Sequence, residues 1–217
     1  MSYSRKVYVK AASTLERRRS KAEHTQSMHR EEAYAKIPEL ISIDREISSA
    51  GAEVIRAIGM GENAQRFIEE LSKKNLAAQQ RRKDILKENG YPENYLDADY
   101  TCKKCRDTGF VSGVMCDCYK ELLRDTALAE LHELSPSTRS TFESFNVNYY
   151  PDTSDPVTGV NPRSRMKEIL DFCKDYAADF GTDSPSLLLY GATGLGKTHL
   201  SLAIASEAIR KGYGVIY

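Results

Sequence analysis

The first ninety residues alternate apolar and polar positions in the three- and four-residue steps that are typical of α-helices. A first helix is predicted to begin at Ser13 or Thr14, either of which can cap it, and to run to Tyr34. It is rich in Arg, Glu and Ala, and its thin apolar stripe consists of Leu15, Ala22, Met28 and Ala33. Because the stripe is so narrow, we expect this helix to be exposed or to pack against a partner.

Two further helices are predicted, and each carries a continuous apolar seam. The second begins near Pro38, which suits the first turn of a helix, and its seam is Leu40, Ile43, Ile47, Ala50, Val54 and Ile58. The third follows the break Gly59-Met60-Gly61 and ends near Gly90, and its apolar positions are Ala64, Phe67, Ile68, Leu71, Ala78, Ile85 and Leu86. Two seams joined by a short glycine break favour an antiparallel helical hairpin, in which the seams pack against each other rather than around a cofactor.

The last third of the chain has a different pattern. Pro162 can start a helix whose apolar face is Met166, Ile169, Leu170, Cys173, Ala177 and Phe180. Two short apolar runs, 186–190 and 214–217, predict strands, and a helical run from Thr198 to Lys211 lies between them. This order predicts the beginning of an α/β domain after the α-helical N-terminal region.

The glycine-rich sequence between the first predicted strand and the following helix is the strongest chemical signal in the chain. It reads G-x-x-x-x-G-K-T, the phosphate-binding P-loop, and the residues are Gly191, Ala192, Thr193, Gly194, Leu195, Gly196, Lys197 and Thr198, with His199 next. Its backbone N–H groups and the helix that follows can hold phosphates. Lys197 is expected to reach the β- and γ-phosphates, and the Thr198 hydroxyl to bind Mg²⁺.

Turnover of the nucleotide requires further groups. P-loop enzymes hold Mg²⁺ with an acidic residue at the end of a later strand and orient the attacking water with another side chain. The strand-like run 214–217 ends without an acidic residue. We therefore expect this chain to bind nucleotide weakly without hydrolysing it, and to be a fragment or truncated form of a longer protein.

Four of the five cysteines form a cluster, in the pattern Cys102-x-x-Cys105, ten residues, Cys116-x-Cys118. Thiolates at this spacing are typical of a structural Zn²⁺ site, and the intervening residues 107–113 predict a tight hairpin that folds the second pair back onto the first. An iron–sulfur cluster or a redox pair is the alternative, and His132 can replace one cysteine ligand. The fifth cysteine, Cys173, is expected to be a buried thiol.

Composition places limits on the class of protein. Charged residues make up 29% and hydrophobic residues 41% of the chain, and the net charge is zero. Residues 1–36 are basic, with nine Lys or Arg against four Asp or Glu, so this segment either contacts nucleic acid or an acidic partner or is a solvated helix face. There is no apolar run of membrane-spanning length and no signal peptide, so we expect a cytoplasmic protein with reduced thiols.

The combination of these motifs resembles a known family. A charged helical region, the cysteine pattern of Thr101–Tyr119, the linker aromatics Phe142, Phe145 and Tyr149-Tyr150, and Gly191–Leu200 are similar to the bacterial replicative helicase loaders of the DnaC/DnaI type. The resemblance implies an AAA+ domain that binds ATP and Mg²⁺, a zinc-bearing N-terminal region that engages the replicative ring helicase, contact with single-stranded DNA, and self-association through a complete core. It assigns the nucleotide to the P-loop residues and zinc to the four cysteines.

This resemblance sets the expected domains and leaves alternatives open. The domains are a coiled-coil-like helical region at 1–90, a zinc knuckle with a following helix at 91–135, and a linker with the start of the AAA+ core at 136–217. The later AAA+ motifs have no counterpart in the sequence. The alternatives are an accessory ATPase of transposition of the IstB type, in which we do not expect the cysteine knuckle, and a non-enzymatic adaptor stapled by zinc.

Overall fold

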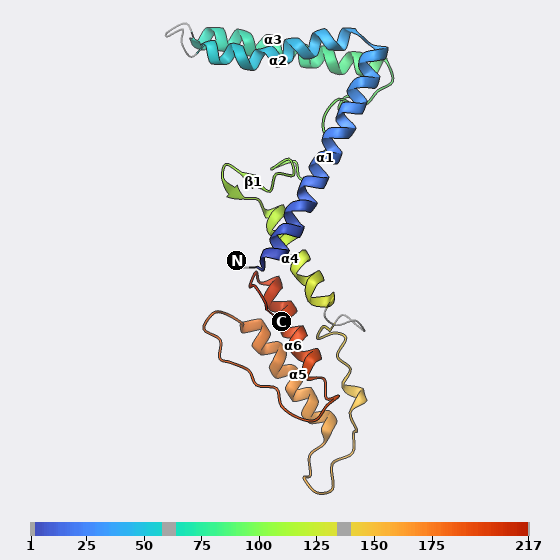
Figure 1. Cartoon of the computed structure of the whole chain (residues 1–217), viewed down its shortest axis with the longest axis vertical. Helices are drawn as coiled ribbons and strands as arrows, with labels where there is room; N and C mark the ends of the chain where they lie inside the picture. Colours follow the sequence, from blue (N-terminus) through green and yellow to red (C-terminus); the bar gives the residue numbers. More distant parts are fainter. Residues whose placement is uncertain (1–2, 58–63, 134–139, 217) are drawn as a thin grey trace. The chain divides into compact units, whose positions relative to one another are not determined.

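The computed structural model describes residues 3–57, 64–133 and 140–216 (Figure 1). The chain divides into two compact units, one formed by 1–15 with 108–217 and the other by 16–107. We describe each unit by itself. The break predicted at Gly59-Met60-Gly61 and the domain boundary predicted between 135 and 136 lie outside the described residues. None of the described helices combines the length and the apolar character that a membrane crossing requires.

The unit formed by 16–107 contains the helical hairpin. Helix α2 spans Glu39–Ala57 and helix α3 spans Ala64–Glu88. They lie side by side in Figure 1, and their pairing is antiparallel: Arg81 lies near Glu39, whereas Leu71 lies beside Ala50. The predicted hairpin is therefore confirmed. Helix α3 ends as predicted, because Gly90 adopts the left-handed backbone conformation (φ 80°) that closes a helix.

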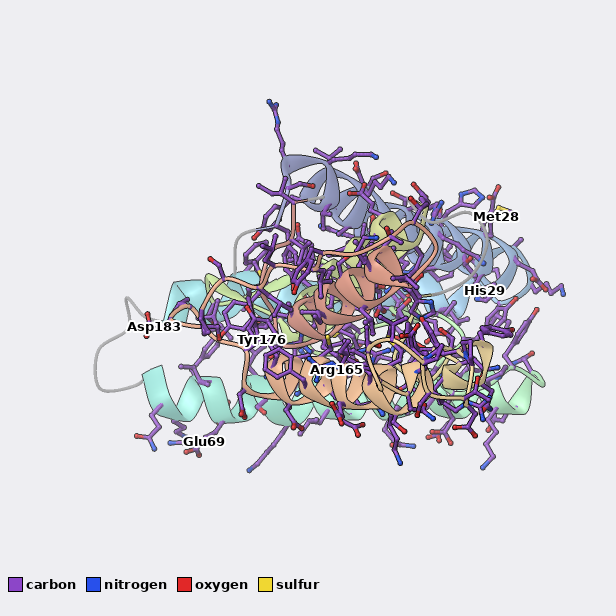
Figure 2. The ribbon with its side chains drawn as sticks, turned by 90° about the horizontal axis from the view of Figure 1, so that it is seen from below. Met28, His29, Glu69, Arg165, Tyr176 and Asp183 are labelled. Carbon is purple, nitrogen blue, oxygen red and sulfur yellow. The ribbon has the colours of Figure 1, made fainter. Side chains whose placement is uncertain are left out.

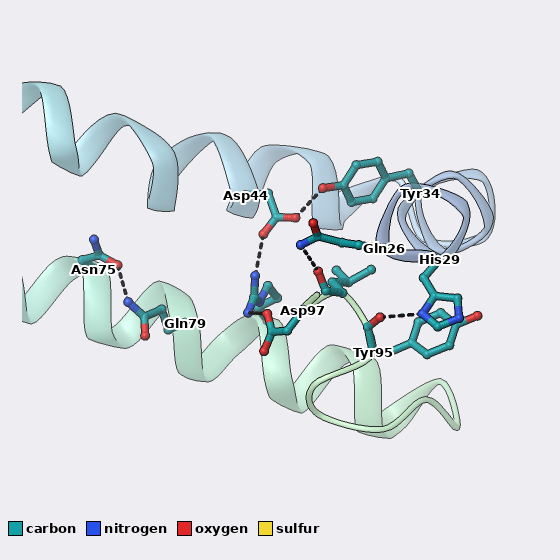
Figure 3. Close-up of polar contacts among 10 residues, drawn as sticks. Gln26, His29, Tyr34, Asp44, Asn75, Gln79, Tyr95 and Asp97 are labelled. Carbon is teal, nitrogen blue, oxygen red and sulfur yellow. Dashed lines mark hydrogen bonds and ion pairs between the residues drawn. The ribbon is translucent and has the colours of Figure 1, made fainter. Parts of the chain in front are cut away.

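The base of this hairpin has an apolar core with a polar network beside it. The core residues are Ala33, Ile37, Leu40, Leu86 and Leu96. Arg82, whose side chain is only 14% exposed, pairs with Asp44 at 3.3 Å and with Asp97 at 2.9 Å, and Tyr34 donates a hydrogen bond to Asp44 (Figure 3). The network connects α2, α3 and the segment after α3. Burial raises the pKa of Tyr34 to about 12, so its phenol stays protonated and can donate the hydrogen bond.

Helix α1 spans Arg5–Lys36 and begins earlier than the sequence predicted. The reason lies in the unit formed by 1–15 and 108–217. There Tyr3, Val7, Ala11 and Leu15, spaced by four, pack with residues of α4 (Asp117–Glu133) and α6 (Lys197–Arg210) in one core. Ser4 Oγ accepts a hydrogen bond from the Val7 N–H and caps this start.

The same unit holds the remaining elements. The strands β1 (Phe110–Val111) and β2 (Val114–Met115) form a two-stranded antiparallel hairpin. A 3₁₀ turn, η2 (Val147–Tyr149), precedes α5 (Pro162–Asp179). Helix α5 begins at Pro162 as predicted, after Asn161, whose side chain accepts from the Ser164 N–H. A core of Phe142, Leu170, Cys173, Ala177, Leu200 and Ala203 joins α5 to α6.

Two strand predictions in this unit are wrong for the described residues. The run 186–190 forms no strand, and its Leu188 and Tyr190 side chains are 83% and 87% exposed. The run 214–216 likewise has no strand, and Tyr217 lies outside the description. The apolar pattern was recognised correctly, but a strand requires a neighbour to satisfy its backbone N–H and C=O groups. The described residues supply none beside either run.

Candidate nucleotide and metal sites

The P-loop backbone is shaped by three glycines with positive φ. Gly191, Gly194 and Gly196 have φ values of 139°, 84° and 73°, a region that side-chain-bearing residues rarely adopt. Gly196 stands at the N-terminus of α6 without a side-chain cap, so the first N–H groups of that helix are not taken by a capping side chain. Such a turn presents backbone donors and the positive end of a helix to an anion.

The Lys197 side chain is turned back onto the loop. Its Nζ donates to the carbonyl oxygens of Gly191 at 2.9 Å and Ala192 at 2.6 Å. Thr193, Leu195 and Thr198 are exposed, so the loop is open to solvent. An ammonium held only by carbonyl dipoles can exchange them for the stronger charge-assisted bonds that a phosphate offers. The residues present therefore fit the phosphates of a nucleotide.

Aromatic residues of the linker close one side of the loop. A Cβ atom placed on Gly196 would lie 2.6 Å from the Phe145 ring and 3.1 Å from the Tyr150 hydroxyl. The Phe145 and Tyr150 rings are stacked with centroids 6.1 Å apart, and burial raises the pKa of Tyr150, which keeps its phenol neutral. Glycine is therefore needed at position 196 for two reasons: its φ is positive, and the Phe145 ring leaves no room for a side chain.

The His199 side chain fastens this linker to the start of α6. Its Nε2 lies 2.8 Å from the Thr141 carbonyl oxygen, which can only accept, so Nε2 carries the hydrogen. Ser144 Oγ lies 3.2 Å from the same nitrogen, and the Phe145 ring meets the imidazole edge-on at 5.2 Å. Sequence analysis grouped His199 with the nucleotide loop and missed this link, because His199 and Thr141 are 58 positions apart in the sequence.

The four clustered cysteines are brought together. The sulfur atoms of Cys102, Cys105, Cys116 and Cys118 all lie within 4.8 Å of one another, and Cys105 and Cys116 are buried. A tetrahedral Zn²⁺ site with Zn–S bonds of about 2.3 Å has sulfur–sulfur edges of about 3.8 Å, so the cluster is close to the required size. The group contains cysteines alone, and the alternative ligand His132 is not part of it.

A buried aspartate shapes the first half of the cluster. Asp107 is 2% exposed and accepts hydrogen bonds from the N–H groups of Thr101 at 2.8 Å and Cys102 at 2.9 Å. The turn is closed by the Arg106 N–H, which donates to the Cys102 carbonyl at 2.8 Å, and both Arg106 and Asp107 have positive φ. Sequence analysis missed this role, although an acidic residue two places after a Cys-x-x-Cys pair is a usable signal.

The second half of the cluster is placed by the β1–β2 hairpin, as predicted. The Cys116 N–H donates to the Gly109 carbonyl at 2.8 Å, and Cys118 lies in the first turn of α4. Gly109 has a φ of 81° and packs closely against Leu15 and Tyr119, so no side chain fits there. The fifth cysteine is separate: Cys173 is fully buried in the α5–α6 core, and burial raises the pKa of its thiol, as the prediction of a buried thiol requires.

Comparison with protein families identifies one similarity. Residues 171–217 match the family described as IstB-like ATP binding protein. The matched segment contains the whole P-loop and α6, and it supports an ATP-binding module of the AAA+ P-loop class in this part of the chain. Comparison with curated proteins and with solved structures finds no match.

Proposed function

We propose that this chain is an ATP-binding protein of the replicative helicase-loader type, which binds the ring helicase and assists its loading on single-stranded DNA. The observation that carries the proposal is the presence of two sites in one chain. An open P-loop at the start of α6 lies in a segment similar to ATP-binding proteins, and a compact four-cysteine cluster precedes it.

In this proposal the P-loop residues 191–198 hold the phosphates of ATP, with Lys197 on the β- and γ-phosphates and Thr198 on Mg²⁺. His199 keeps the aromatic linker against the loop. The four cysteines hold Zn²⁺ in a closed structural site, because four protein ligands leave no position for catalysis. Residues 1–135 engage the helicase.

ATP binding is tested with a fluorescent ATP analogue and the full chain in the presence of Mg²⁺. Saturable binding that unlabelled ATP displaces and that Lys197→Ala weakens at least tenfold supports the nucleotide role. Lys174→Ala removes an exposed lysine from the neighbouring α5 and is the matched control. Equal binding by both variants contradicts the assignment to the P-loop.

Helicase binding is tested by retention of the purified ring helicase on the immobilised full chain, with Cys105→Ser as the variant and Cys173→Ala as the control. We expect the helicase to be retained by the parent chain and the control and lost with Cys105→Ser. If the parent chain retains no helicase, the loader proposal fails, whereas ATP binding is unaffected by that result.

A second candidate function is favoured by the family match at residues 171–217, namely an accessory ATPase of transposition of the IstB type. The two functions differ in their partner. Retention of a transposase, rather than a replicative helicase, by the same immobilised chain decides for this candidate.

A further inference from the structure

The two flanks of the α2–α3 hairpin differ in their chemistry. On one flank the Arg81 guanidinium of α3 lies 3.9 Å from the carboxylates of Glu39 and Glu46 of α2, so ion pairs bridge the two helices there. Leu76 is five positions from Arg81 and therefore points to a different side of α3. On that side the junction of the helices is a groove of about 370 Å³ without a charged residue in its lining. The larger apolar residues of the lining are Val54, Ile68, Leu71 and Leu76.

The groove leaves apolar side chains in contact with water. Leu76 is 62% exposed, and Val54 and Ile68 are 38% and 37% exposed. The polar residues of the lining are neutral, and Gln79 donates a hydrogen bond to Asn75 Oδ1 at 2.7 Å, within α3 (Figure 3). A helical surface of this kind, uncharged and with an exposed leucine, is typical of a face that another helix covers.

Helix α3 adds a regular seam beside this groove, with the steps of three, four, three and four residues that are typical of a coiled coil. The seam consists of Glu69, Ser72, Leu76, Gln79 and Lys83. Leu76 is its centre, with an acid seven positions before it and a base seven positions after it. Glu69 is exposed, as Figure 2 shows, and its carboxylate accepts a hydrogen bond from Gln65 at 3.4 Å. Within residues 3–57, 64–133 and 140–216, neither Glu69 nor Lys83 belongs to an ion pair.

The order of these charges is complementary to an antiparallel copy of the same helix. When Leu76 lies against Leu76 of a second copy, Glu69 of each chain meets Lys83 of the other, because both are seven positions from the centre. Helix α2 has four acidic and two basic residues, whereas α3 has seven basic and four acidic ones. Helix α3 of the second copy, placed in the groove, therefore also meets an α2 of opposite net charge. A partner of unrelated sequence does not require this symmetry.

We propose that the groove and the seam of α3 together bind a second copy of this chain. The two hairpins then form an arrangement of four helices with a two-fold axis near Leu76. Burial of Leu76, Ile68 and Val54 provides the apolar contribution, and the two Glu69–Lys83 pairs select the antiparallel register. A dimer of this kind goes beyond the proposed function, because the resemblance assigns self-association to a complete AAA+ core and not to the helical hairpin.

Sedimentation velocity of the full, zinc-loaded chain without nucleotide tests the proposal over a series of micromolar concentrations. We expect the parent chain to change from monomer to dimer as its concentration rises. Leu76→Glu places two like charges against each other at the axis and should weaken the dimer at least about tenfold. Because Leu76 is already exposed in the single chain, this variant should keep the helix content of the parent, which circular dichroism measures.

Ala77→Glu is the matched control for Leu76→Glu. It adds the same charge at the next position of α3, which is also exposed but is turned away from the seam. We expect this control to change the dissociation constant of the dimer less than about twofold, because an exposed charge away from an interface has little effect. The comparison separates loss of the interface from a general effect of added negative charge.

Exchange of the two seam charges tests the antiparallel register. Glu69→Lys alone and Lys83→Glu alone each make both pairs repulsive and should weaken the dimer about tenfold. The double variant Glu69→Lys/Lys83→Glu again places opposite charges together and should recover the affinity of the parent. A mixture of the two single variants should form a heterodimer, because all of its pairs are attractive. Energy transfer between differently labelled chains measures this heterodimer.

Four results overturn the proposal. Three of them are a parent chain that stays monomeric at every concentration, equal loss of the dimer in Leu76→Glu and Ala77→Glu, and a double charge variant that dimerises no better than the single variants. The fourth is retention of the purified ring helicase by a monomeric parent chain that Leu76→Glu abolishes, which assigns the groove to the helicase. ATP binding and helicase retention are measured separately, so absence of the dimer leaves the proposed function unaffected.

Discussion

The cysteine cluster and the P-loop are both short segments of sequence that prepare a place for a charged ligand, but they do so with different atoms. In the cluster, four cysteine side chains point to one place, and as thiolates they repel one another unless a cation lies between them. The P-loop offers the backbone N–H groups of a turn whose positive φ angles are provided by three glycines. Its lysine donates hydrogen bonds to carbonyl oxygens of the same loop. A side-chain site therefore depends on its ligand for stability, whereas a backbone site keeps its fold without one.

Removal of the metal should have the largest effect on stability, and it should distinguish the cysteine cluster from the P-loop most clearly. Structural zinc contributes on the order of 10 kcal/mol in small zinc modules, so Cys105→Ser or chelation should unfold the segment 101–119. We expect a large rise in amide hydrogen exchange there, measured by mass spectrometry. Cys173→Ala should retain one zinc per chain and normal exchange. Unchanged exchange after chelation would show that the cluster folds without metal.

Replacement of Asp107 should have the next largest effect on stability, because its buried carboxylate accepts hydrogen bonds from two backbone N–H groups of the cysteine turn. Asp107→Ala leaves both donors unpaired and should cost about 2–3 kcal/mol of unfolding free energy. It should also speed the release of zinc to a chelator. Asp107→Asn keeps one acceptor and should lose about half as much. Urea unfolding checks both variants, and equal stability of Asp107→Ala and the parent contradicts the role.

Gly196→Ala tests whether the P-loop fold rests on its glycines. The left-handed backbone alone should cost about 1–2 kcal/mol, and the approach of Phe145 adds to it. Phe145→Leu in the same chain should recover part of the loss. Gly51→Ala is the control: it lies in α2 with nothing within 4 Å of an added Cβ, and it should be neutral or stabilise by about 0.5–1 kcal/mol. Thermal unfolding measures all three, and equal midpoints would disprove the steric argument.

Lys197→Ala should have the smallest effect on stability, within about 0.5 kcal/mol, because the lysine is bonded only to exposed carbonyls of its own loop. The same variant should lose ATP affinity. At the P-loop, therefore, ligand binding can be lost without loss of stability. At the cysteines we expect both to be lost together. A loss of stability comparable to that of Gly196→Ala would mean that the lysine supports the fold and would weaken the contrast.

The helices were predicted from the sequence because their signals are local. The seams of the α2–α3 hairpin, the Pro162 start of α5 and the Gly90 end of α3 each depend on neighbours within a few residues. The early start of α1 was missed because Tyr3, Val7 and Ala11 form a helical stripe only when distant parts of the chain cover them. The runs 186–190 and 214–216 were predicted as strands from side-chain pattern alone, which carries no information about a partner for the backbone.

The sequence by itself determined the two chemical segments, since cysteine spacing and a glycine-rich loop before a helix are local patterns with a direct physical meaning. Only the tertiary structure decided that Asp107 is buried in the cysteine turn and that His199 and Phe145 hold the linker against Gly196. These relations join residues that are distant in sequence or depend on which groups become buried. The free energy of such contacts exists only after the chain has folded.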